Sequence, residues 1–305
     1  MTLTTSTNPG PLDHALSQFV SVRPRLFGMA YRMLGSAADA DDIVQSAWLR
    51  WQTTDRSEVL DPPAFLSTMT ARLAMNHAAS AHERRQSYIG PWLPEPVDTS
   101  GDPYLGAERG DALELAVLVL LEKLSPKERG AYVLREAFDY TYEKISEVLG
   151  LEEANVRQLV SRARKHIDDG RRAPVNPHEQ ERLLKAFVAA AQQGDAAALE
   201  ELFASDIVSY SDGGGVVRAA SKPVCGREVV AKFIAKATTF VWQNGVTPMW
   251  VRINGQAAVA FARDGVVGGL VTITASVEGI DQIMWMMRPS KLAAISPHPH
   301  DSRPA

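Results

Sequence analysis

The chain has almost no cysteine and no long apolar run, and each absence narrows what it can be. A single cysteine, Cys225, excludes an intramolecular disulfide and disfavours a cysteine-based metal site, and we expect it to be a small buried hydrophobe. No apolar stretch of about 18 residues is present, so no membrane span is expected. The first residues, MTLTTSTNPGPLD, lack the basic and apolar regions of a signal peptide, which predicts a cytoplasmic protein.

The chain also lacks a large net charge, and a long stretch of its second half lacks histidine. A formal net charge of −4 over 305 residues gives no global basic field, so any affinity for nucleic acid must be local. No histidine lies between Glu179 and Pro297, which removes a common general base from that part. Apolar residues make up 45% and charged residues 22%, a composition typical of soluble proteins, and the length suits about two to three domains.

Residues 125–172 carry the most specific pattern in the sequence, a helix-turn-helix. Ser125 to Glu128 forms a capping box with a proline at the first helical position, and we expect helices over 126–138, 142–149 and 153–169. Gly150 supplies the left-handed turn residue. The last helix buries one apolar stripe, consisting of Val156, Leu159, Val160, Ala163 and Ile167. Its opposite face is polar and basic, with Asn155, Arg157, Gln158, Ser161, Arg162, Arg164 and Lys165.

These polar residues have the chemistry that reads duplex DNA. Asn155, Arg157 and Gln158 stand in the N-terminal part of the helix and suit base edges in the major groove. Phosphate contacts position a protein without specifying sequence, and the residues suited to them are Arg162, Arg164, Lys165, Arg171 and Arg172. An ordinary amphipathic helix with a solvated charged face is the alternative. The capped helix, the short helix and the glycine turn before it favour DNA binding.

The N-terminal third is predicted to be helical over 13–34, 37–53 and 62–82. The second of these helices places Ile43, Val44, Ala47, Trp48 and Trp51 on one face. Asp39, Asp42 and Gln45 lie on an adjoining polar face, where a helix N-terminus favours acids. The third helix carries Asn76 and His77 and leads into Arg84 and Arg85.

The rest of the chain changes character twice. Residues 86–106 are rich in proline and glycine and read as a linker, but Tyr88, Ile89, Trp92 and Leu93 suggest that it packs against something. We expect a helix over 107–123 directly after this linker. A second break lies at 170–177, and helices over 179–193, 195–204 and 226–237 are expected after it. A strand near 207–210 leads to a glycine-rich turn, and strand-like runs over 249–253, 257–262, 266–277 and 282–288 follow. Positive-φ turns at Asn254-Gly255, Asp264-Gly265 and Glu278-Gly279 separate these runs into an antiparallel meander, which makes this part α+β.

Taken together, these segments resemble the extracytoplasmic-function (ECF) subfamily of sigma-70 factors. DADDIVQSAWLRW is similar to their region-two helix, AFLSTMTARLAMNHAASAHERR to their promoter −10 reader, and the helix-turn-helix to region four, the −35 reader. The linker and the C-terminal part resemble the subgroup with a fused SnoaL-like (NTF2-like) domain. That subgroup has a WLPEP linker, a DGGGK-type loop and an NPDKL-type ending. Trp92 to Pro96 matches fully, Val216 replaces the lysine of the loop, and Arg288 to Leu292 matches in part.

The resemblance implies a multidomain fold: two all-α sigma domains followed by an α+β SnoaL-like cone. The domains expected are a disordered tail (1–12), region two (13–85), a linker with the WLPEP motif (86–106), region four (107–172), a second linker (173–178), the SnoaL-like domain (179–296) and a disordered tail (297–305).

The resemblance also implies a bacterial promoter-specificity subunit that binds core RNA polymerase and promoter DNA, without a cofactor, a metal or chemistry of its own. Asp42 and Gln45 match positions that meet core polymerase. The −10 candidates are Asn76, His77, Arg84 and Arg85. The residues expected to regulate activity between domains are Trp92, Leu93, Pro94, Asp212, Gly213, Gly214, Gly215 and Lys291.

Alternatives remain for the C-terminal part. SnoaL-like relatives include cyclases and isomerases, so a tethered pocket enzyme or small-molecule sensor is one alternative, and a plain repressor using only residues 125–172 is another. The available acids are Asp206, Asp212, Asp264 and Asp281, most of them beside expected turns where solvated acids are normal. Several large apolar side chains would fill a core, the favoured reading, or line a ligand pocket. They are Trp242, Trp250, Phe261, Met284, Trp285 and Met286. A regulatory module docked through the Trp92 linker and the glycine-rich loop is favoured over an enzyme.

Overall fold

The computed structural model describes residues 11–99, 114–170, 172–242 and 245–295. The chain divides into two compact units, one made of residues up to His82 with Leu124–Arg164, the other of Glu83–Lys123 with the chain from Lys165 onward. The expected tail at 297–305, the end of the linker at 100–106 and the start of the helix expected over 107–123 lie outside the described residues.

The N-terminal part of the first unit consists of three long helices. They are α1 (Pro11–Leu34), α2 (Ala37–Thr53) and α3 (Pro62–Gln86), with a 3-10 turn, η1 (Arg56–Glu58), before α3. The Ser36 hydroxyl caps α2 by accepting a hydrogen bond from the Asp39 amide. Trp51 is fully buried against α1, and its Nε1 donates to the Ala15 carbonyl at 3.1 Å. The expected helices are confirmed, although α1 begins two residues early and α3 continues four residues past 82.

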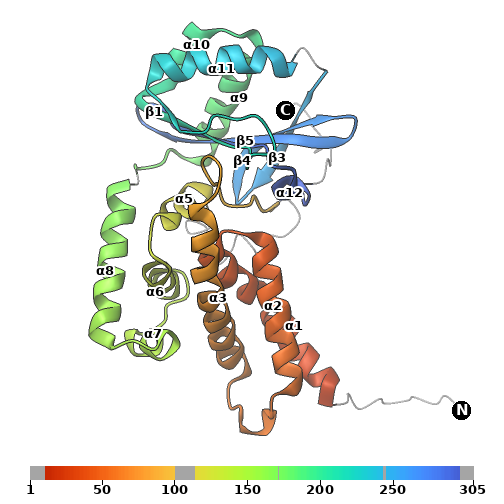
Figure 1. The fold of residues 1–305 in the computed structure, drawn as a ribbon, viewed down its shortest axis with the longest axis vertical. Helices are drawn as coiled ribbons and strands as arrows, with labels where there is room; N and C mark the ends of the chain where they lie inside the picture. The colour runs from red at the N-terminus through yellow and green to blue at the C-terminus, as the bar shows by residue number, and fades with distance from the viewer. Residues whose placement is uncertain (1–10, 100–113, 171, 243–244, 296–305) are drawn as a thin grey trace, which may run out of the picture. The chain divides into compact units, whose positions relative to one another are not determined.

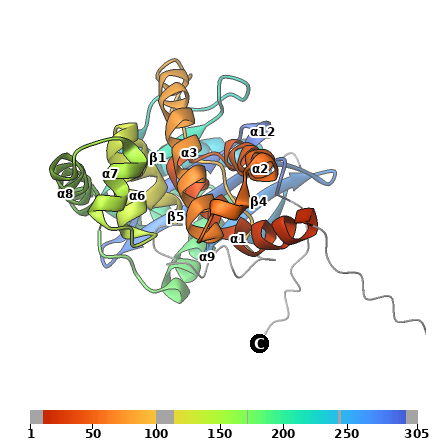
Figure 2. The ribbon, with the colours of Figure 1, turned by 90° about the horizontal axis from the view of Figure 1, so that it is seen from below.

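The helix-turn-helix of the first unit is confirmed in its details. It consists of α6 (Pro126–Glu136), α7 (Tyr142–Leu149) and α8 (Glu153–Gly170), which lie next to one another in both views of the chain (Figures 1 and 2). Both hydrogen bonds of the capping box between Ser125 and Glu128 are present. Gly150 ends α7 with φ of 63°, a conformation that glycine adopts without a Cβ penalty.

The second unit packs helices onto one face of a sheet. Helices α9 (Pro177–Gln193), α10 (Ala196–Leu202) and α11 (Arg227–Trp242) cover that face (Figure 1), and α5 (Leu115–Glu122) and the short α12 (Pro289–Leu292) complete the helices described there. An apolar core joins the helices to the sheet. The rings of Phe187, Phe203, Phe261 and Trp285 meet within it at centroid separations of 6.0–6.3 Å.

Within the described residues, the strands form one six-stranded sheet in the order β2-β1-β6-β5-β4-β3. The strands are β1 (Phe203–Asp212), β2 (Val224–Cys225), β3 (Thr247–Ile253), β4 (Gln256–Arg263), β5 (Val266–Ser276) and β6 (Gly279–Met286). The meander from β3 to β6 is antiparallel as expected, and positive φ at Asn254, Gly255, Asp264 and Gly265 confirms two of its turns.

Strand β1 corrects the sequence prediction in two ways. It runs over ten residues rather than the four expected, and it takes the end of the helix expected over 195–204. It also pairs with β6 in parallel, so the sheet is mixed. Short-range turn signals cannot reveal this pairing, because the two strands are far apart in the sequence.

Candidate nucleic-acid interface and linker clasp

The solvent face of α8 carries every residue predicted to read DNA there. Asn155, Arg157, Gln158, Ser161, Arg162, Arg164 and Lys165 are all exposed. On the opposite side of the helix, Val156, Leu159, Val160, Ala163 and Ile167 are buried. Burial of one stripe fixes the rotation of α8, and the amides, hydroxyl and cations are therefore presented to solvent together.

Three arginines on this face are held by acidic side chains. Arg157 pairs with Glu153 and lies 5.0 Å from the ring centroid of Tyr142. Arg164 Nη2 is 2.7 Å from Glu136 Oε1, and Arg162 Nε is 3.3 Å from Glu128 Oε1. Exposed ion pairs of this kind contribute only about 0.2–1 kcal/mol each, so they can be exchanged for contacts to phosphate.

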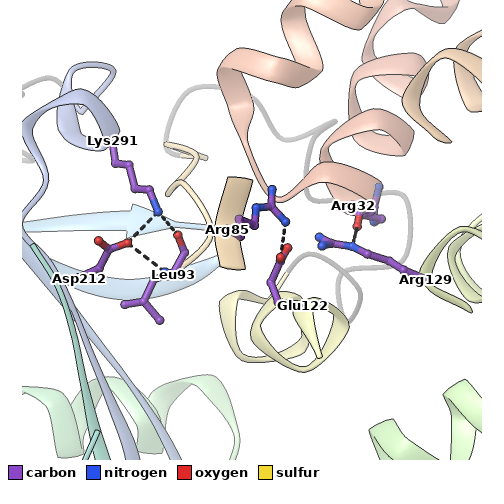
Figure 3. A network of polar contacts seen from close by, with 7 residues as sticks. All are labelled: Arg32, Arg85, Leu93, Glu122, Arg129, Asp212 and Lys291. Carbon is purple, nitrogen blue, oxygen red and sulfur yellow. Dashed lines mark hydrogen bonds and ion pairs between the residues drawn. The ribbon is translucent and has the colours of Figure 1, made fainter. Parts of the chain in front are cut away.

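The four −10 candidates lie along α3 and differ in their surroundings. Asn76 and Arg84 are exposed. His77 is half-buried, with Nε2 3.4 Å from Asp39 Oδ1. Arg85 is more enclosed: its side chain is 16% exposed and pairs with Glu122 (Figure 3). Its guanidinium carbon lies 3.8 Å from the ring centroid of Trp92. The structure therefore gives Arg85 a role in holding the linker, which sequence reasoning missed.

The predicted polymerase-contacting residues share an outer face of α2. Asp42 and Gln45 are three residues apart and both exposed, and Leu49 follows four residues later with 56% of its surface exposed. Residues at this spacing are neighbours on a helix surface. The face thus combines an acid, an amide and an apolar side chain, a mixture suited to contact with a protein.

A buried polar cluster within the second unit, which we call the linker clasp, joins Tyr88 and Leu93 of the linker to Asp212 and Lys291. Asp212 is 0% exposed. Its carboxylate accepts hydrogen bonds from the Leu93 amide at 2.9 Å and from Lys291 Nζ at 2.7 Å (Figure 3). It also accepts one from the Tyr88 hydroxyl at 2.5 Å. Lys291 Nζ also donates to the Leu93 carbonyl.

Burial shifts the pKa values of two groups in the clasp, Lys291 and Tyr88. It lowers the pKa of Lys291, while the Asp212 carboxylate opposes that shift. It also raises the pKa of Tyr88 to about 12, helped by the hydrogen bond to Asp212, so the phenol remains a donor. Trp92 adds to the clasp, since Lys291 Nζ lies 4.0 Å from its ring centroid, and Arg85 also contacts its ring. Each charge in the cluster therefore has a partner, as buried charges require.

The glycine-rich loop brings its backbone close to the linker. A Cβ added to Gly214 would lie 2.8 Å from the Tyr88 hydroxyl, and one added to Gly215 would lie 3.0 Å from Ile89 Cδ1. Both glycines have positive φ. The linker therefore packs against this loop, and Leu93 and Pro94 of the linker are buried.

The linker has a second attachment at the β3 edge of the sheet. Asp98 forms an antiparallel bridge with Ile253 of β3, and the Thr99 amide donates to the Arg252 carbonyl at 3.0 Å. The buried Asn254 side chain accepts from the Val97 amide at 3.1 Å. The linker therefore covers the β3 edge as well as the glycine-rich loop.

Two sequence expectations about this part are wrong. Asp212 is not a solvated turn residue, because β1 extends to it and three donors surround it. Cys225 is exposed rather than buried, since it lies on the two-residue edge strand β2. Among the large apolar residues expected to fill a core or line a pocket, Met284 and Met286 are fully buried, and Phe261 and Trp285 line a cavity. The side chain of Trp242 lies outside the described residues.

The other acids considered for catalysis lie in two places: Asp206 and Asp281 line one hollow together with Arg172, and Asp264 lines a separate apolar cavity. Asp206 and Asp264 are exposed, and Asp281 accepts a hydrogen bond from the Thr274 hydroxyl. Burial raises the pKa of Asp281. Among the described residues there is no group of three or more His, Cys, Asp or Glu placed to hold a metal ion, and no helix there is long and apolar enough to cross a membrane.

Comparisons with known proteins agree with the two helical regions. Residues 19–84 match the family model for sigma-70 region 2, and residues 114–167 match that for sigma-70 region 4. The chain is 38% identical over 228 residues to the ECF RNA polymerase sigma factor SigJ of Mycobacterium tuberculosis, covering 72% of each chain. This chain belongs to the ECF family of RNA polymerase sigma factors.

Other members of the ECF family extend the similarity into the C-terminal part. The probable sigma factor SigI of M. tuberculosis is 29% identical over 274 residues, which cover 88% of this chain and 92% of SigI. The crystal structure of M. tuberculosis SigJ superposes with a TM-score of 0.76 at 31% identity, over 92% of this chain and 99% of that one. The fold expected from the sequence, sigma domains followed by an α+β domain, is confirmed.

Proposed function

We propose that this ECF sigma factor brings core RNA polymerase to promoters through three surfaces: the outer face of α2 for polymerase, α3 for the −10 element and α8 for the −35 element. The observation that carries the proposal is the exposed face of α8, on which Asn155, Arg157 and Gln158 stand in the N-terminal turns. Such side chains make bidentate contacts with base edges. The sigma factors that it resembles carry out no bond chemistry, and polymerase does the synthesis.

The second part of the proposal is that the C-terminal unit controls this activity through the linker clasp. The linker starts where α3 ends, so it directly follows the −10 candidates. Its fixation by Asp212 and Lys291 restricts the segment that connects the two promoter-reading regions. A plain repressor would leave the exposed Asp42, Gln45 and Leu49 face without a role.

The proposal is tested by transcription in vitro with core polymerase and a panel of genomic promoters. Gln158→Ala should cost about 1–3 kcal/mol of binding at its base pair and relax specificity there. Lys165→Ala should weaken all promoters alike and lower the salt slope by about one. Lys127→Ala, an exposed lysine on α6, is the matched control and should change neither. Absence of specific transcripts from the unaltered protein would overturn the proposal.

A further inference from the structure

The second unit contains an apolar cavity of about 880 Å³. That volume lies within the roughly 300–1,000 Å³ typical of small-molecule sites. Its apolar walls come from α11, the meander and the loop after β1, and they include Val217, Ala220, Phe233, Ile234, Phe261 and Trp285. A cavity of this size and lining favours an apolar ligand.

Two arginines give the cavity a positive side. Arg218 and Arg263 both line it and are both exposed. Arg263 Nε lies 3.7 Å from Asp264 Oδ2, a long contact, and Arg218 has no ion-pair partner among the residues that the structure describes. Asp264 is the only acid lining the cavity in that part of the chain, so two guanidinium groups face one carboxylate there.

The loop after the glycines separates the cavity from the linker. Val217 to Ala220 line the cavity. The same loop faces Ile89 and Gly90 of the linker, and a Cβ added to Gly90 would lie 3.8 Å from the Ala220 carbonyl. Ser211 also lines the cavity, and the next residue in β1 is Asp212 of the linker clasp. One short segment therefore contacts both features.

We propose that this cavity binds a small amphiphile with an apolar body and a single anionic group, the anion lying toward Arg218 and Arg263, and that the bound ligand strengthens the linker clasp. The binding step stands on the cavity alone. Only the effect on the clasp rests on the proposed regulatory function. A ligand packed against residues 217–220 restrains the loop whose other side holds the linker.

Binding is tested by calorimetry on the full chain with decanoate, kept below its micelle concentration, against decanol and acetate. Decanoate should bind more tightly than either. Arg218→Ala should weaken decanoate about fivefold, the factor that corresponds to an exposed ion pair, and leave decanol unchanged. Lys222→Ala, an exposed lysine of the same loop that does not line the cavity, should change nothing. Equal binding of decanoate and decanol, or no binding of either, would overturn the proposal.

A cavity-filling variant provides a second test. A Cβ at Gly269 would lie 3.7 Å from the Phe261 ring and 3.8 Å from Met287 Cγ, both ordinary contacts, so the strand accepts a side chain there. Gly269 lines the cavity, and the two further methyl groups of Gly269→Val should reduce its volume. It should weaken decanoate and decanol together. Unchanged binding in a folded Gly269→Val protein would place the ligand elsewhere and contradict the assignment.

The effect on the clasp is read by hydrogen exchange at the Leu93 amide, which donates to Asp212. Decanoate at ten times its Kd should slow that exchange by up to about tenfold, because the ligand binds only the closed loop. Binding without slower exchange would refute the coupling and leave the binding site intact. Neither measurement uses polymerase, so either failure is distinct from failure of promoter-specific transcription.

Discussion

Substitution of Lys291 by methionine tests the linker clasp most directly. Methionine keeps most of the side-chain volume and removes the ammonium, which donates both to Asp212 Oδ2 at 2.7 Å and to the Leu93 carbonyl. The Asp212 carboxylate is 0% exposed and would lose its only cationic hydrogen-bond partner in the described structure. The Tyr88 hydroxyl and the Leu93 amide would remain as its donors.

The expected loss of folding free energy in Lys291→Met comes from leaving the Asp212 carboxylate buried without its cationic partner. Removal of one member of a buried ion pair costs about 3–5 kcal/mol. The two remaining donors place the expected loss for Lys291→Met near the lower end, about 3 kcal/mol. Asp212→Asn/Lys291→Met should cost clearly less than the sum of its single changes, because no unpaired charge remains. The expected signature is a double change that costs about 2 kcal/mol less than the sum of the two single changes.

The assay is urea unfolding of the second unit within the full chain, with hydrogen exchange at Leu93 as the local readout. Lys291→Met should accelerate that exchange, and Lys222→Met, a change at an exposed lysine, should alter stability by less than about 0.5 kcal/mol. Transcription assays on the same proteins then show whether release of the linker changes output. Equal stability of Lys291→Met and the unaltered chain would refute the reasoning, since it would mean that Asp212 gains nothing from the ammonium.

Three further outcomes follow from local structure. Gly150→Ala should destabilise the first unit by about 1 kcal/mol, measured by urea unfolding, because φ is 63° there while no atom lies within 4 Å of the added Cβ. Ser125→Ala should cost about 1 kcal/mol in the same assay through loss of the capping box, whereas Ser125→Thr should not. Burial raises the pKa of Asp281 above its ordinary 3.8, so the folded protein keeps this proton to higher pH than the unfolded chain does. As pH rises from about 3.8 through the folded pKa, the unaltered protein loses stability and Asp281→Asn does not, so the variant gains stability relative to it. Below about pH 3.8 the variant should show no gain. A gain that grows toward low pH would contradict this sign.

Local patterns in the sequence predicted the helices and turns well, while long-range pairing escaped them. The capping box at Ser125 and the left-handed Gly150 are local features, readable within a few residues, and both are confirmed. The parallel pairing of β1 with β6 joins residues more than 70 positions apart, and no local signal encodes it. Asp212 was misjudged for the same reason: its neighbours in sequence are turn glycines, but its partners in space are Leu93 and Lys291.

The cationic partner of Asp212 comes from Lys291, in the C-terminal ending that matches the related subgroup only in part. Val216, which stands where the related loop carries lysine, is 71% exposed and contributes no charge. Lys291, from the partly matching ending, delivers the ammonium to Asp212 instead. A clasp built from charges and hydrogen bonds differs from an apolar one, because water can satisfy each group again when the linker leaves. We infer that this composition suits an attachment that opens during function, since hydration of the released polar groups offsets part of the cost of exposing Leu93 and Pro94.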